Sequence, residues 1–477
     1  MENPAFDGGK AFEHLEHLSV TIGPRLTGSP GEHKAATYIA RVLRSCGLKV
    51  TRQRFPVVTF NNRKCVLEVR QGGRWRQVAA EPVMLSKSTP LGGVEGEIYF
   101  AETGQAEYLT PAMKGKVVLV CGRIAAEDRR RMIGYRAKAL ISIDPTVREG
   151  LRRALVGSEN RKTYGSLPMV GIRHLDGVEI IKRGPGRARL VLRNTERKSY
   201  SLNVIGEKAG TDLADEIVVV CAHYDSHWRI PGAGDNAGGT AVMLELARVL
   251  AARPSRRTLR FIAFAAEETG LHGSTFYANR LARLDRREKR KASFDERVDG
   301  TECDRHRLTF NIDVHGCVLG RYLATYNGPQ DLGASVRLLA KQIGMACEVE
   351  KKPMSSDGTP LAAVGVPNVQ FARYGGTTIY GHGPGDDVRW ISPVALGKAG
   401  EFSERYLIRY VTDAAALAFP REIPEEQMTD IRKYFTDRKL PVPGEAPRKR
   451  ASTRRAKGRR KRKQTTRRHD ALTSATE

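Results

Sequence analysis

Seven residues between positions 223 and 382 have the side chains and the spacing of a metal-binding site. They stand at the ends of hydrophobic runs or in glycine-rich turns: His223, Asp225, Asp235, Glu267, Glu268, Asp313 and His382. Imidazole nitrogens and carboxylate oxygens are ligands of zinc and related divalent ions. Because the carboxyl ends of strands in an open α/β sheet meet at one crevice, we expect these side chains to lie together. The pattern predicts a site for a pair of ions.

The first three of these residues have structural alternatives when each is taken alone. His223 follows an apolar run, and Asp225 could engage the ring nitrogen that does not bind metal. Taken alone, this pair is more typical of a core histidine beside a turn aspartate. Asp235 lies in GAGDNAGG, where small residues let the backbone approach closely and direct a carboxylate into the crevice. The alternative for Asp235 is a helix N-cap.

The remaining candidates lie further along the chain. Glu267 and Glu268 follow the apolar run FIAFAA, and two carboxylates so close repel unless a cation compensates. Adjacent side chains point in different directions, so one can bind metal while the other moves a proton. Asp313 ends LTFNID and could instead cap a helix or turn. His382 lies in YGHGPGDD, a loop too flexible to bury a histidine for packing.

Elements that could position these residues alternate between strand and helix from residue 199 onward. The expected strands are 216–222, 259–265, 308–314 and 368–372, and the expected helices are 238–252, 273–284, 330–344 and 394–418. This order predicts an α/β fold with a mixed, mainly parallel sheet and helices on both faces.

The rest of the chain divides by composition. Residues 10–46 look helical, with a periodic stretch that opens at Ser29-Pro30-Gly31 and closes at Gly47. Residues 48–80 alternate as strands, with turns at Asn61-Asn62 and Gly72-Gly73. Short β runs between 91 and 194 predict an inserted, mostly-β domain. Residues 284–307 are charge-dense and predict a surface excursion. The predicted domains are 1–90 and 196–420 for the catalytic body, 91–195 for the insert, and 421–477 for a C-terminal helix and basic tail.

Composition limits the function classes. A chain of 477 residues with 40% hydrophobic residues can form two domains plus tails. No run approaches the length of a membrane span, and the first residues lack the features of a signal peptide. Seven cysteines without a CxxC pair fit a reducing cytoplasm, so we expect a cytoplasmic location.

The formal charge of +27 is concentrated in part at the C-terminus. Thirteen Lys and Arg residues and no acid lie between Arg448 and Arg468. Such an apolar-poor segment is expected to be disordered and to attract polyanions without sequence specificity. The charge by itself does not indicate sequence-specific reading of nucleic acid.

The chain resembles the zinc aminopeptidases with two co-catalytic metals, a family that includes glutamate carboxypeptidases and glutaminyl cyclases. HxD at His223, GAxDNAxG around Asp235, EExGLxGS from Glu267, NxD at Asp313 and HxPxDD from His382 occur in the order of that family. Residues 18–48 resemble its N-terminal helical region. Residues 91–194 resemble the protease-associated domain often inserted into these enzymes.

The resemblance implies a role for each candidate residue. His223 and Asp313 would bind one Zn²⁺, Glu268 and His382 a second, and Asp235 would bridge the two; cobalt or manganese could substitute. Glu267 would be the general acid/base for a metal-bridging hydroxide that attacks the peptide carbonyl, and Asp225 would orient His223.

Four residues are not settled by the resemblance. Gly234 stands where the family often has a second aspartate. His227 is a spare imidazole, either an exposed loop residue or a substrate contact. Asp357 lies in SSDGTP, where relatives have SDH. Tyr374 is a candidate oxyanion donor.

The function predicted from the sequence is a dinuclear zinc exopeptidase, an aminopeptidase that hydrolyses N-terminal residues from peptides. The alternatives are a carboxypeptidase or dipeptidase and a one-zinc enzyme resembling glutaminyl cyclases, which would not need both His223 and Asp313. A catalytically silent protein of the same fold, tethered by its tail to nucleic acid or anionic membrane, is the alternative from another class. The oligomeric state is not indicated.

Overall fold

The computed structural model describes residues 5–445 except 149, 185 and 292–299. The described residues up to Gly444 belong to one compact unit. The basic tail, predicted to be disordered, and the centre of the predicted 284–307 excursion lie outside these residues. Within the described part, no helix has the length and apolar character needed to cross a membrane.

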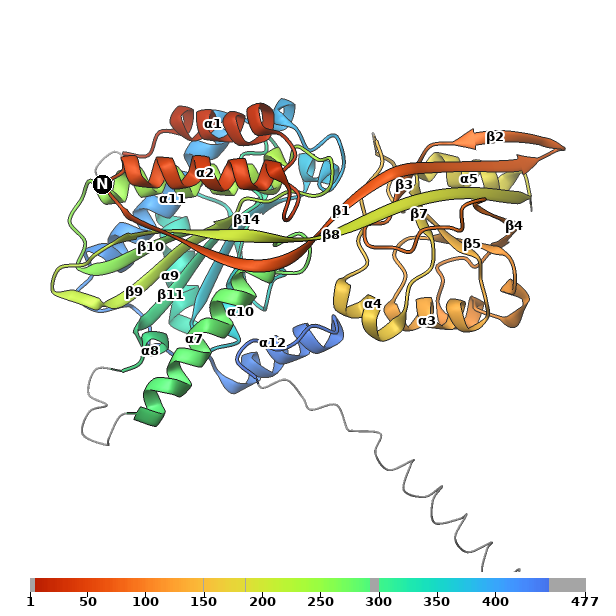
Figure 1. Ribbon diagram of the computed structural model, residues 1–477. Helices are drawn as coiled ribbons and strands as arrows, with labels where there is room; N and C mark the ends of the chain where they lie inside the picture. The colour runs from red at the N-terminus through yellow and green to blue at the C-terminus, as the bar shows by residue number, and fades with distance from the viewer. Residues whose placement is uncertain (1–4, 149, 185, 292–299, 446–477) are drawn as a thin grey trace, which may run out of the picture. The chain divides into compact units, whose positions relative to one another are not determined.

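A mainly parallel sheet forms the catalytic body, as predicted (Figure 1). The strand order is β13-β12-β14-β11-β9-β10-β8. Strand β9 pairs in parallel with both β10 and β11, and β11 pairs in parallel with β14. The edge strand β13 is parallel to β12, which is antiparallel to β14. The strand bounds are β9 Leu213–His223, β10 Arg257–Phe264, β11 His306–Asp313, β12 Arg321–Asn327, β13 Cys347–Lys351 and β14 Asn368–Tyr374.

Helices cover both faces of this sheet because its central strands are apolar on both sides. Along β9, Val218 and Val220 pack into one hydrophobic core, and Val219 and Cys221 pack into the other. The helices that contribute to the first core are α1 Gly8–Glu16, α2 Pro30–Ser45, α6 Gly239–Ala251, α9 Gln330–Gln342 and α11 Pro393–Leu407. Those that contribute to the second are α7 His272–Lys291, α8 Glu302–Arg305 and α10 Gly358–Ala362.

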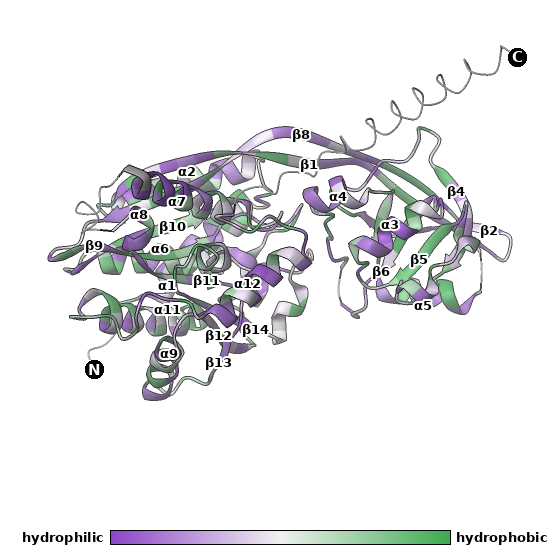
Figure 2. Ribbon diagram, turned by 90° about the horizontal axis from the view of Figure 1, so that it is seen from below, coloured by the Kyte–Doolittle hydropathy of each residue, from purple (hydrophilic) through white to green (hydrophobic). Residues whose placement is uncertain are grey.

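Two long strands connect this sheet to a second group of elements (Figure 1). Strands β1 (Lys49–Gln71) and β8 (Arg187–Lys208) pair along almost their whole length, and β8 pairs with β10 at one end and β4 at the other. The sheet continues as β4-β5-β6-β7-β3. Apolar strands such as β5, coloured as hydrophobic in Figure 2, form its core. The remaining strand bounds are β2 Arg74–Val78, β3 Ala80–Pro82, β4 Val94–Phe100, β5 Val117–Cys121, β6 Ala139–Ile143 and β7 Met169–Ile172.

Within this second group, helices alternate with the strands, which the sequence did not predict. They are α3 Ala126–Gly134, α4 Ser158–Tyr164 and α5 His174–Lys182. Its core also includes Leu67 and Val78, which precede the predicted insert boundary at 91. A further helix, α12 Glu425–Asp437, belongs to the C-terminal extension.

The structure refines two local predictions. The helical region predicted for 10–46 is divided at Gly23, which has a φ of 77°, and at Pro24, which has no N–H to continue a helix. Its second part begins at Pro30, as predicted, with Ser29 as N-cap. The predicted turn at Asn61-Asn62 is a bulge in the continuous strand β1, because Asn62 donates to Arg193 O and Asn194 Oδ1 of β8. The strands β12 and β13 were not predicted.

Candidate metal centre

A cavity of about 290 Å³ opens at the carboxyl ends of the central strands. Five of the predicted site residues line it: His223, Asp235, Glu267, Asp313 and His382. Asp225 and Glu268 are buried beside them. All seven predicted residues therefore come together from separate segments of the chain.

The first ligand cluster forms around His223, which ends β9 and is almost fully buried. Its Nε2 lies 3.3 Å from Asp235 Oδ1 and 3.2 Å from Asp313 Oδ1. One ligand atom from each of the three residues lies within 4.8 Å of the ligand atoms of the other two. One imidazole and two carboxylates converging in this way match the donors that zinc accepts.

The second cluster forms around His382 and shares Asp235 with the first. His382 Nε2 lies 3.2 Å from Asp235 Oδ2 and 3.1 Å from Glu268 Oε2. Asp235 thus directs one oxygen toward each imidazole. Burial lowers the pKa of His382, but Glu268 and Asp235 raise it more, so the pKa of His382 lies well above its ordinary value. The carboxylates around His382 therefore stabilise positive charge at this position.

An unpaired buried oxygen also indicates that these residues hold a cation. Glu268 Oε1 is buried and has no hydrogen-bond partner among the described residues. Leaving a buried carboxylate oxygen unpaired is costly, and a divalent ion would remove that cost.

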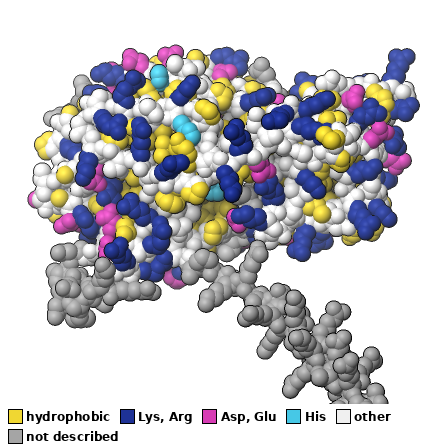
Figure 3. Space-filling view, viewed as in Figure 1, with side chains coloured by type: hydrophobic (Ala, Val, Ile, Leu, Met, Phe, Trp, Pro, Cys, Tyr) yellow, Lys and Arg dark blue, Asp and Glu magenta, His cyan; other side chains and the backbone are white. Residues whose placement is uncertain are grey.

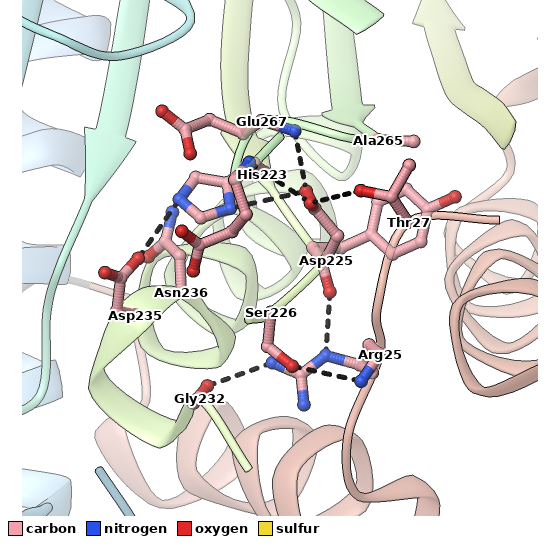
Figure 4. Close-up of polar contacts among 12 residues, drawn as sticks. Arg25, Thr27, His223, Asp225, Ser226, Gly232, Asp235, Asn236, Ala265 and Glu267 are labelled. Atoms are coloured by element: carbon pink, nitrogen blue, oxygen red, sulfur yellow. Dashed lines mark hydrogen bonds and ion pairs between the residues drawn. The ribbon is translucent and has the colours of Figure 1, made fainter. Parts of the chain in front are cut away.

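Asp225 organises the backbone as well as the imidazole of this site (Figure 4). Its Oδ1 lies 3.6 Å from His223 Nδ1 and accepts the Glu267 N–H at 3.0 Å. Its Oδ2 accepts the Glu268 N–H at 3.2 Å. A single buried carboxylate therefore links the end of β9 to the acidic pair that follows β10.

Asp386 holds the loop that presents Asp235, a role the sequence did not reveal beyond its place in the HxPxDD motif. Its two carboxylate oxygens accept the N–H groups of Gly234, at 2.7 Å, and of Asp235, at 3.2 Å. Burial raises the pKa of Asp386 to about 7. A Cβ at Gly234 would lie 3.1 Å from both Asp386 Oδ1 and Cys317 Sγ, so there is little room here for the aspartate expected from the resemblance.

Arg25 is a further residue that sequence reasoning missed. Its guanidinium is fully buried and donates to the carbonyls of Tyr224, at 2.7 Å, and Gly232, at 2.9 Å (Figure 4). Burial lowers its pKa to about 10, so it remains charged. Arg25 therefore ties the N-terminal region to both ends of the loop between His223 and Asp235. Its only sequence signal was its place in the segment that resembles the family's N-terminal region.

The other candidates occupy different positions. Glu267 lines the cavity and belongs to neither ligand cluster, and burial raises its pKa well above the ordinary range. Tyr374 also lines the cavity. Asp357 is buried outside the cavity lining, with its pKa raised to about 7 by burial. His227 is 3% exposed, so the prediction of an exposed loop residue was wrong.

The segment after β6 also reaches the cavity. Arg148 and Arg152 line it, and the Arg153 N–H donates to the carbonyl of His382 at 2.7 Å. Arg148 pairs with Asp144 at 3.1 Å and donates to Ile379 O. Arg152 is exposed and forms no hydrogen bond or ion pair with any residue that the structure describes. A cationic side chain therefore stands unpaired at the cavity.

A mainly parallel α/β sheet with two adjoining clusters of nitrogen and oxygen ligands at its strand ends is an architecture of zinc exopeptidase-like proteins. Comparison with known families agrees: residues 203–407 match peptidase family M28. Aminopeptidase YwaD of Bacillus subtilis is 31% identical over 408 residues, which cover 83% of each chain. The chain belongs to peptidase family M28.

Two other similarities bear on the site. The structure of BSAP, a zinc aminopeptidase from Bacillus subtilis, has a TM-score of 0.68 and 29% identity, and the match covers 90% of this chain and 100% of that one. Carboxypeptidase Q of Mus musculus is 26% identical over 293 residues, which cover 56% of this chain and 61% of that protein.

Proposed function

We propose that this M28 peptidase is an aminopeptidase that holds two zinc ions per chain and releases N-terminal residues from peptides. The observation that carries the proposal is Asp235, whose two oxygens reach the imidazoles of His223 and His382 separately. The names of YwaD and BSAP support the aminopeptidase activity, and that of BSAP supports zinc.

The residues divide the work of such a reaction. His223, Asp235 and Asp313 would hold one ion, and Asp235, Glu268 and His382 would hold the other. Bound zinc would polarise the scissile carbonyl and lower the pKa of water. Glu267, outside both clusters, is placed to take a proton from water and deliver it to the leaving amine. Asp225 would keep His223 oriented.

A substrate panel tests the proposal directly. The purified protein would be assayed on a leucyl chromogenic amide, the same compound with an acetylated amine, and a γ-glutamyl amide. An aminopeptidase cleaves the first and spares the acetylated compound. A peptide that is blocked at its amine and has a free C-terminus completes the panel, and its cleavage would instead identify a carboxypeptidase.

A dipeptidase is a second candidate, which Arg152 favours specifically. A dipeptide places its terminal carboxylate one residue beyond the scissile bond, and an unpaired guanidinium at the cavity could bind that carboxylate. An aminopeptidase acting on long peptides has no carboxylate at that position.

Arg152→Ala is expected to raise KM for a dipeptide by about 3–10-fold, since one partly hydrated ion pair contributes only modestly. KM for the same dipeptide with an amidated C-terminus should not change, because that substrate carries no charge there. Steady-state kinetics on both substrates measure the difference. Arg130→Ala, an exposed arginine outside the cavity lining, is the matched control. Equal effects on acid and amide would argue against carboxylate binding.

We also propose that the basic tail binds polyanions without contributing to catalysis. The tail has 13 basic residues between Arg448 and Arg468, and none of the candidate ligands. Basic side chains are also spread over the face of the body seen in Figure 3, so the body should retain some attraction of its own.

Deletion of residues 447–477 is expected to leave kcat and KM for a short neutral peptide unchanged. Elution from a heparin column should move to lower salt, because fewer counterions are released on binding. A tail with its Lys and Arg residues replaced by Gln serves as the length-matched control and should behave like the deletion. A large loss of peptidase activity in either variant would show that the tail contributes to the site.

We propose a reducing, cytoplasmic location from the state of the cysteines. The structure pairs none of the seven cysteines in a disulfide, and three of them are buried. Thiol counting by mass spectrometry on protein from its native host would test this. Disulfide-bonded species would contradict it.

The resemblance of residues 91–194 to a protease-associated domain remains a prediction.

A further inference from the structure

His227 lies against the second ligand cluster but has no part in the sequence-based assignment of ligands. Its side chain is buried, and its ring stacks on that of His382 with centroids 5.0 Å apart and planes inclined by 29°. A ring nitrogen of His227 falls within 4.8 Å of ligand atoms of both Glu268 and His382. Two imidazoles and a carboxylate therefore converge on one point.

The polar atoms of this group have fewer partners than their burial demands. His227 Nδ1 is buried and has no hydrogen-bond partner among the described residues, and the same is true of Glu268 Oε1. Two unpaired polar atoms in one buried group would each be destabilising. A cation held between the residues would give the His227 ring and the Glu268 carboxylate a partner, since neutral imidazole and carboxylate are both metal ligands.

The two alternative roles of His227 fit less well. Packing alone explains His227 less well, because an apolar side chain of similar size would fill the same space without leaving a buried Nδ1 unpaired. A substrate contact would face the cavity, yet His227 is absent from its lining, whereas the neighbouring His382 contributes to it.

We propose that His227 is a zinc ligand, so that the second ion is held by two imidazoles, Glu268 and the bridging Asp235. This inference rests on the proposed function, because it assumes that zinc occupies the site. The first ion would have a single imidazole, from His223, together with Asp235 and Asp313. The two positions would then differ in affinity, and the nitrogen-rich position would favour zinc or cobalt over manganese more strongly.

Zinc binding to metal-free protein, in competition with a chromogenic chelator, tests the assignment. His227→Ala should weaken zinc binding at one of two positions by at least about 100-fold, since even residues that only orient ligands change affinity by 10–100-fold. The other position should keep the affinity it has in the unsubstituted protein. His306→Gln is the matched control: it removes a fully buried imidazole that bonds Tyr277 and belongs to neither ligand cluster. It should retain both affinities.

X-ray absorption at the zinc edge gives a readout that needs no variant. Protein loaded with two zinc ions should show three imidazoles shared between them, and His227→Ala loaded at high zinc should show two. Two imidazoles in the unsubstituted protein, or unchanged zinc affinity in a folded His227→Ala, would overturn the inference. Either result would leave the proposed function intact as long as two zinc ions bind and support activity. Failure of the unsubstituted protein to bind zinc would overturn the proposed function itself.

Discussion

Glu267→Gln is expected to retain two zinc ions while kcat falls by about 10²–10⁴-fold. Glu267 lines the cavity but belongs to neither ligand cluster, so the amide removes a proton acceptor without removing a ligand. Metal analysis of the dialysed variant and steady-state kinetics on a leucyl amide substrate measure the two properties separately.

Glu268→Gln is the matched control, because the same change is made one residue further along the chain. Its Oε2 lies 3.1 Å from His382 Nε2 in the second cluster, so zinc content should fall in this variant together with activity. If Glu268→Gln kept its zinc and Glu267→Gln lost it, the roles within the acidic pair would be reversed.

Removal of metal is expected to abolish hydrolysis completely. The two clusters bring Asp235, Glu268 and Asp313 together around two imidazoles, and without ions the site has neither a polarised carbonyl nor an activated water. Treatment with a strong chelator should reduce activity to background, and zinc or cobalt should restore it. Calcium, which prefers oxygen ligands, is the control ion and should not restore it.

Stepwise addition of zinc to the metal-free protein separates the remaining alternatives. Activity that returns in proportion to two zinc ions per chain supports the dinuclear site, whereas full activity at one ion would favour a mononuclear enzyme like the glutaminyl cyclases. A protein that binds no zinc after dialysis against it would be the catalytically silent alternative. Full activity in a metal-free preparation would contradict the proposed mechanism outright.

Much of the candidate site could be predicted because its residues occupy recognisable positions in short stretches of sequence. His223 and Asp313 end strands β9 and β11, and Glu267 follows β10, as their apolar runs predicted. Parallel strands in one sheet bring their carboxyl ends to the same edge, so position along each run was sufficient to place the ligands. The position of Asp235 could be predicted in the same way, because the small residues of GAGDNAGG let the backbone approach closely and direct the carboxylate into the crevice.

Long-range pairing was not readable in this way. Asn61-Asn62 has the composition of a turn, yet β1 continues through it because β8, more than 130 residues later, supplies hydrogen bonds along the whole strand. Helical periodicity over residues 10–46 likewise did not reveal the turn at Gly23, after which the guanidinium of Arg25 donates to the carbonyl of Tyr224. Local propensity yields where tertiary contacts outweigh it.

The sequence by itself determined which residues could bind metal and the order of the strands and helices that present them, because both depend on side-chain type and short-range periodicity. Only the tertiary structure decided how they are held. Arg25 meets the carbonyl of Tyr224 across 199 positions of sequence, and Asp386 meets Gly234 across 152. The burial of His227 and the approach of Arg152 to the cavity are likewise products of packing between distant segments. No local pattern encodes such contacts, since their energy depends on which surfaces the folded chain brings together.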